Sequence, residues 1–137
     1  MKFKFNSSEL TAENKRWISV GRQAVDNIWA MLREVSFLAE RQVKSQMPVD
    51  TGRARASWGH WTPGDIRGNS DANVGDAWWK EQKESLTTEQ GSNVDYVQGL
   101  NEGHSAQAGA GFIDRVEEEM ARELEKEVDD IIKFWGS

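Results

Sequence analysis

Two long stretches of this chain carry apolar residues at steps of three and four, the spacing that places side chains on one face of an α-helix. The first stretch runs from Thr11 to Met47 and the second from Phe112 to Trp135. Their apolar residues are, in order, Trp17, Val20, Ala24, Ile28, Leu32, Val35, Ala39 and Val43, then Ile113, Val116, Met120, Leu124, Val128, Ile131 and Trp135. Two long amphipathic helices are therefore predicted, and the fold must bury both apolar faces.

Several residues at the ends of these stretches are typical of helix starts or helix stops. Pro48 disfavours helical geometry at Met47, so the first helix is expected to end there. In the second helix, Asp114 near the start and Lys133 near the end suit the helix dipole.

The segment between the helices is predicted from shorter patterns. Ala54, Ala56 and Trp58 alternate with polar residues, which favours a half-buried strand after a turn at 49–53, with Trp58 as its core anchor. Residues 63–75 are rich in Gly, Asn, Asp and Ser and predict a long flexible loop. We expect a short helix at 76–83, a strand at 85–90 and a helical turn around Tyr96 and Leu100.

Composition limits the class of protein. The 137 residues are 37% hydrophobic and predict one domain over 1–137, of the α+β class, with two long helices packed on a small antiparallel sheet. A net charge of -6 argues against a protein whose main ligand is nucleic acid. The chain has no Cys, and no run of apolar residues is long enough to span a membrane, so no membrane partner is expected. Seven Trp fit either a core or a subunit interface.

No pattern in the sequence predicts an enzyme. His60 and His104 are the two histidines, and neither has a partner at a metal-binding spacing. The run from Gly103 to Gln107 weakly resembles a nucleophile elbow with Ser105 at its centre, but it lacks the final Gly and a preceding parallel-strand pattern. We therefore expect no catalytic residue, metal or cofactor.

Three cations, Lys44, Arg53 and Arg55, lie close to the turn that follows the first helix. Such a cluster could dock an acidic surface of a partner, with Arg53 and Arg55 projecting from one face of the expected strand. Simple surface solubility is the alternative.

Two blocks of sequence resemble one family when they are taken together. The first is the end of the long helix and its turn, 39–58, which finishes in PVDTGRARASW. The second is 93–112, NVDYVQGLNEGHSAQAGAGF, which departs from the family pattern at Gly109, where Pro is usual. Both are similar to signatures of the neck and tail-completion proteins of tailed bacteriophages, a group that includes the minor tail protein Z of lambda. The resemblance covers roughly 25–125, and residues 62–92 match little.

The resemblance implies a structural virion protein that completes the tail or joins it to the head. It would be made in the host bacterial cytoplasm and assemble as a ring, of six subunits or a multiple of six, around the DNA channel. Its partners would be other copies, head-tail connector proteins and tail terminator or tube proteins, with DNA as passing cargo. The positions carried over as interface or motif residues are Asp50, Thr51, Gly52, Arg53, Arg55, Trp58, Tyr96, Leu100, Asn101, Gly103, Ser105 and Gln107.

Two other functions stay open from the sequence. Within the same class, the chain could be a tail terminator or a head-tail stopper. A more distant alternative is a small cytosolic DNA- or protein-binding regulator, which would require a basic face on an otherwise acidic chain.

Overall fold

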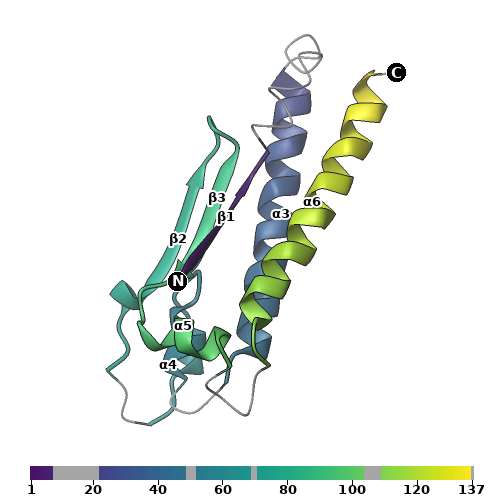
Figure 1. Cartoon of the computed structure of the whole chain (residues 1–137). Helices are drawn as coiled ribbons and strands as arrows, with labels where there is room; N and C mark the ends of the chain where they lie inside the picture. Colours follow the sequence, from purple (N-terminus) through teal and green to yellow (C-terminus); the bar gives the residue numbers. More distant parts are fainter. Residues whose placement is uncertain (8–21, 49–51, 69–70, 104–108, 137) are drawn as a thin grey trace.

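Two long helices pack beside a three-stranded antiparallel sheet in this α+β chain (Figure 1). The computed structural model describes residues 1–7, 22–48, 52–68, 71–103 and 109–136. The predicted fold class is confirmed, and the buried apolar residues of the helices and the sheet form one continuous cluster. No helix in these described ranges has the length and apolar character that crossing a membrane requires.

The long helices are α3 (Arg22–Gln46) and α6 (Phe112–Gly136), and they run antiparallel (Figure 1). The end of α3 confirms the stop predicted from Pro48, whereas the predicted start at Thr11 lies outside the described residues. The periodic residues whose burial is described lie in the core as expected, whereas Trp17, Val20 and the Trp135 side chain lie outside the description. The buried residues are Ala24, Ile28, Leu32, Val35, Ala39 and Val43 in α3 and Ile113, Val116, Leu124 and Val128 in α6, with Met120 and Ile131 partly buried.

The sheet comprises β1 (Lys2–Asn6), β2 (Ala77–Gln82) and β3 (Thr87–Ser92), in the order β1-β3-β2. The register places Phe3, Gln90 and Trp79 in one row across the strands. This row belongs to the inner face of the sheet, which packs on α3. The outer face points away from α3 and carries Lys2, Lys4, Trp78, Lys80, Thr87 and Glu89.

Two strands differ from the sequence-based expectations. The short helix expected at 76–83 is wrong, because this segment forms β2. Trp78 and Trp79 are adjacent, and in a strand they turn to opposite faces, one stacking under Lys2 and the other on Phe37. β1 was not predicted, although Phe3 and Phe5 alternate with Lys2 and Lys4 and are buried. The strand expected at 85–90 is present two residues later, as β3.

The strand expected over 54–60 is also wrong. Residues 53–57 form a helical turn, α4 (Arg53–Ser57), in which Ala56 N donates to the Gly52 carbonyl at 2.9 Å. Ala54, Ala56, Ser57 and Trp58 are all buried, so the burial follows one side of a turn and not an alternation. The expected loop contains two single 3₁₀ turns, η1 (Pro63–Asp65) and η2 (Val74–Asp76), and the helical turn around Tyr96 is confirmed as α5 (Tyr96–Asn101).

A buried polar contact ties the sheet to α3 and to the end of α4. Trp58 is completely buried, as predicted, and its Nε1 donates to Gln90 Oε1 at 2.9 Å. The Gln90 side chain in turn donates through Nε2 to the Ser36 carbonyl of α3 at 2.9 Å. The indole ring also packs on Phe3, with ring centroids 5.5 Å apart. One glutamine side chain thus joins three elements inside the core.

We expect Trp58→Phe to lower the free energy of unfolding by about 1–3 kcal/mol, because it leaves the buried Gln90 oxygen without its donor. Urea denaturation followed by circular dichroism measures this change. Trp79→Phe is the matched control, since Trp79 Nε1 donates to the exposed Glu81. Equal losses for the two variants would contradict the importance of the buried bond.

Candidate functional site: the corner where the motif blocks meet

The two sequence blocks that carry the resemblance are joined by hydrogen bonds near the end of α4 and the segment that precedes α5, both at the lower end of the molecule in Figure 1. Asp76 of η2 joins them: its side chain accepts from Arg53 of the first block, and its carbonyl accepts from Asn93 N of the second at 2.8 Å. Ser92 joins them a second time. Its Oγ lies 2.7 Å from Ser57 Oγ and accepts from Val94 N at 3.1 Å.

Arg53 and Asp76 form a two-point ion pair. Arg53 Nε donates to Asp76 Oδ2 at 3.0 Å, and Nη2 donates to Oδ1 at 3.2 Å. Asp76 is 7% exposed, and its Oδ2 also accepts from Asn73 N at 3.1 Å. The hydrogen bond from Arg53 holds the pKa of the Asp76 carboxyl below its ordinary value of 3.8. The pair therefore fixes the irregular segment before β2 to α4.

Gly52 is the residue of the first block whose identity the backbone requires. Its φ is +79°, in the left-handed region, and it precedes the first turn of α4. A Cβ at this position would overlap the carbonyl oxygen of Asp65. A larger residue would have to displace η1 from α4.

Asn101 of the second block holds the beginning of α6. Its side chain is buried, and Oδ1 accepts from Ile113 N at 2.8 Å and from Asp114 N at 3.3 Å. Its Nδ2 donates to Asp114 Oδ2 at 2.9 Å. These bonds satisfy backbone donors that a helix start leaves free, so Asn101 caps α6 from a distant position in the sequence.

The three cations expected to form a docking patch are all used within the chain. Arg53 pairs with Asp76, and Arg55 Nη2 donates to the Met47 carbonyl at the end of α3, at 3.0 Å. Lys44 Nζ donates to the His60 carbonyl at 2.7 Å and to Thr62 Oγ1 at 2.9 Å, and burial lowers its pKa. The strand from which Arg53 and Arg55 were expected to project is wrong, because α4 forms there and directs both side chains to partners in their own chain. Contact of these residues with another subunit stays a prediction.

The other predicted positions have varied surroundings. Tyr96 is 45% exposed, Leu100 is partly buried against the core, and Gly103 lies in the turn after α5. Asp50, Thr51, His104, Ser105 and Gln107 lie outside the described residues, so the arrangement of His104 and Ser105 stays untested.

An aromatic cluster that sequence analysis missed lies on the surface beside the corner. Phe37 of α3 and Trp79 of β2 stack with centroids 5.1 Å apart, and the His60 ring lies 4.2 Å from Trp79. Glu40 accepts from the His60 ring Nδ1 at 2.8 Å. No linear spacing connects these residues, since they come from a helix, a strand and the segment between them.

The described residues contain no group of His, Asp or Glu side chains arranged to hold a metal ion. Comparison with known proteins gave no significant match to any family model, curated protein or solved structure. The site is therefore defined by its own geometry: a corner whose polar groups position two long helices and a sheet.

Replacing Asp76 should destabilise the fold in a pH-dependent way. At pH 7, Asp76→Asn should lower the free energy of unfolding by about 1.5–3 kcal/mol, because the Arg53 guanidinium loses a charged acceptor. The pKa in the folded chain lies below the ordinary value of 3.8, so this stabilisation is complete above pH 3.8 and is lost as the pH falls through the folded pKa.

Urea denaturation at pH 7 and at pH 3 measures the effect, and the two chains should differ less at the lower pH. Asp95→Asn is the control, because Asp95 precedes α5 without forming a side-chain cap. A difference that is independent of pH would contradict the role of the charge.

Removing the Asn101 cap should loosen the start of α6. We expect Asn101→Ala to lower the free energy of unfolding by about 1–2 kcal/mol and to speed amide hydrogen exchange in the first turn of α6. Gln98→Ala, on the exposed side of α5, should leave both unchanged. Unaltered exchange at Ile113 and Asp114 in Asn101→Ala would contradict the capping role.

Proposed function

We propose that this chain is a structural virion protein of a tailed bacteriophage that completes the tail or joins it to the head. In this role it assembles as a ring around the DNA channel, with six subunits or a multiple of six, and contacts head-tail connector and tail terminator or tube proteins. Its work is binding and geometry, and the proposal includes no catalytic step. A tail terminator or a head-tail stopper is the alternative within the same class.

One observation carries the proposal. The two blocks that resemble the neck and tail-completion family are separated in sequence, yet Arg53, Asp76 and Asn93 connect them at a single corner. Ser57, Ser92 and Val94 connect them again. A pair of chance matches would have no reason to share hydrogen-bonded partners. The shared corner instead supports reading both blocks as parts of one inherited structural unit.

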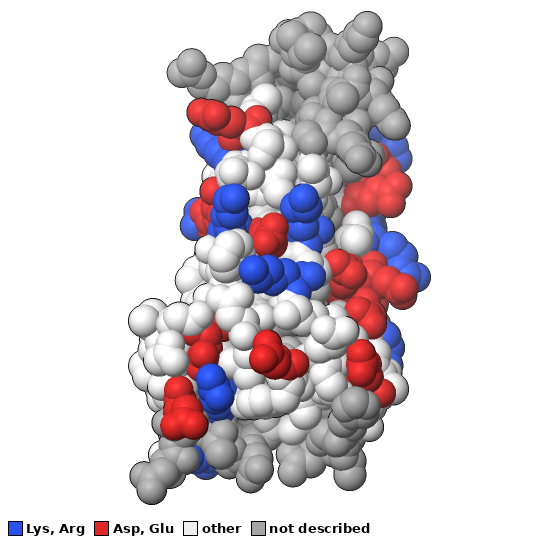
Figure 2. Space-filling view, turned by 60° about the vertical axis from the view of Figure 1, so that its left-hand side comes forward, with Lys and Arg blue, Asp and Glu red and all other residues white. Residues whose placement is uncertain are grey.

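A second candidate, a small DNA- or protein-binding regulator, is favoured by one feature. The outer face of the sheet carries Lys2, Lys4 and Lys80, which is a basic surface on an acidic chain (Figure 2). A regulator would bind duplex DNA or a protein target in the absence of virion assembly, and a gel-shift measurement at low and high salt separates the two candidates.

The proposed function is tested with a phage whose genome encodes this chain. An amber mutation in the gene should give filled heads and separate tails in electron micrographs, and the wild-type virion should contain the chain at the head-tail junction. Expression of the chain from a plasmid should restore joined particles. Infectious virions of normal shape without the chain would overturn the proposal.

A further inference from the structure

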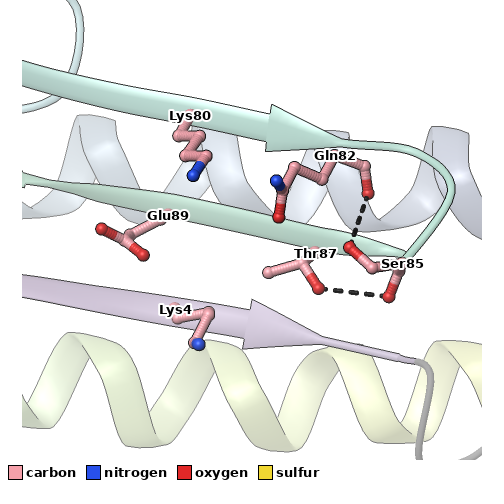
Figure 3. A pocket seen from close by; sticks show the side chains of 6 residues that line it. All are labelled: Lys4, Lys80, Gln82, Ser85, Thr87 and Glu89. Carbon is pink, nitrogen blue, oxygen red and sulfur yellow. Dashed lines mark hydrogen bonds between the residues drawn. The ribbon is translucent and has the colours of Figure 1, made fainter.

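The outer face of the sheet is a charged surface, and none of the helices and strands that the structure describes covers it (Figure 1). Its central row runs Lys4, Glu89, Lys80 across the three strands. Figure 2 shows blue groups gathered around a red one in the middle of this side of the molecule. A hollow of about 310 Å³ lies here, lined by Lys4, Lys80, Gln82, Ser85, Thr87 and Glu89 (Figure 3).

The charges of this face are held in place by their neighbours. Lys2 Nζ lies 3.5 Å from the centroid of the Trp78 ring, and Trp78 Nε1 donates to Glu89 Oε1 at 2.7 Å. Gly91 leaves room for the Lys2 side chain to cross β3, because a Cβ there would lie against it. Lys4 and Lys80 form no ion pair with any described residue, so both remain available to a partner.

The complementary charge lies on α6, on the other side of α3 (Figure 1). Glu119, Glu123, Glu127 and Asp130 follow one another at helical spacing, and within the described structure none of them pairs with a cation. The neighbouring carboxylates of Glu123 and Asp130 raise the pKa of the Glu127 carboxyl. These four residues are called the acidic stripe below.

The spacings of the two surfaces agree. Lys4 and Lys80 are separated by two strand spacings, or about 10 Å. Glu123 and Asp130 are seven residues apart on a helix, a rise of about 10 Å. A helix laid across the strands could therefore place one carboxylate near each lysine.

We propose that the outer sheet face of one copy docks on the acidic stripe of α6 of a second copy. The two surfaces lie on different sides of the same chain, so the contact is head-to-tail and repeats from copy to copy, as a closed ring requires. The inference rests on the proposed ring assembly and names the surfaces that form it.

A second copy fits this face better than a nucleic acid does. Glu89 lies between Lys4 and Lys80 and would face any phosphate placed across the row. The net charge of -6 also repels a polyanion at long range. In the acidic stripe, Glu123 and Asp130 match the spacing of the two lysines, and Glu127, whose pKa is raised, lies between them where it would face Glu89.

Charge reversal in both surfaces tests the contact. Lys4→Glu with Lys80→Glu, and separately Glu123→Lys with Asp130→Lys, should each weaken self-association of the purified chain at least about tenfold in sedimentation velocity. An equimolar mixture of the two variants should associate again, because each reversed surface then meets its new complement. Circular dichroism before each run confirms that the variants are folded.

The matched control is Arg41→Glu with Arg67→Glu, which changes the net charge by the same amount as the sheet-face variant at exposed positions outside the three strands. It should associate like the wild type. The wild-type association should also weaken with added salt.

Several results would overturn the contact. These are a wild-type chain that stays monomeric, sheet-face variants that associate normally, or two weakened variants whose mixture is not restored. Loss of duplex DNA binding with intact self-association in Lys4→Glu/Lys80→Glu would assign the face to nucleic acid instead.

A different result would overturn the proposed function, namely absence of the chain from virion necks. A chain that is present in necks while its charge variants associate normally would overturn the contact alone. Charge-dependent association of a chain that is absent from virions would overturn the proposed function alone.

Discussion

The buried bonds around Gln90 are the interaction on which the rest of the structure depends. This side chain accepts from Trp58 and donates to the Ser36 carbonyl, so it joins the sheet, the segment after α4 and the middle of α3. Ser36 Oγ continues the polar contact to Thr88 on the same strand. Burying so many polar atoms is costly unless each finds a partner. Each of these buried groups has a partner, so the bonds hold the sheet on α3 in the observed arrangement.

The buried bonds around Gln90 also position the corner where the two motif blocks meet. Trp58 positions the end of α4, and α4 turns Arg53 toward Asp76 at the start of β2. Asn101 then fixes the beginning of α6 next to the same corner. The polar motif residues Arg53, Arg55 and Asn101 thus have partners within the chain. Among the described residues, the surfaces open to a partner include the outer face of the sheet, the acidic stripe and the aromatic cluster around Phe37.

The motif residues and the exposed charged surfaces are therefore different parts of the molecule, and they support the proposed function in different ways. The polar residues of PVDTGRARASW that the structure describes keep the subunit in shape, and assembly would depend on residues outside the motif. Lys4 and Lys80 lie in segments that carry no family resemblance, as does Glu89 between them.

The sequence by itself determined the two long helices and the end of α3, because apolar spacing and Pro48 act locally along the chain. It also identified Trp58 as a core residue and placed β3 to within two residues. Only the tertiary structure decided the forms of the segments between. Alternating residues after Gly52 fit a strand equally well, and α4 forms because Gly52 adopts a left-handed φ against η1. Trp78 and Trp79 lie in a strand that turns them to opposite faces of the sheet. Trp78 contacts Lys2 on one face, and Trp79 contacts Phe37 on the other. The helical form of 53–57 and the strand form of 77–82 depend on contacts between distant segments, which no local sequence pattern encodes.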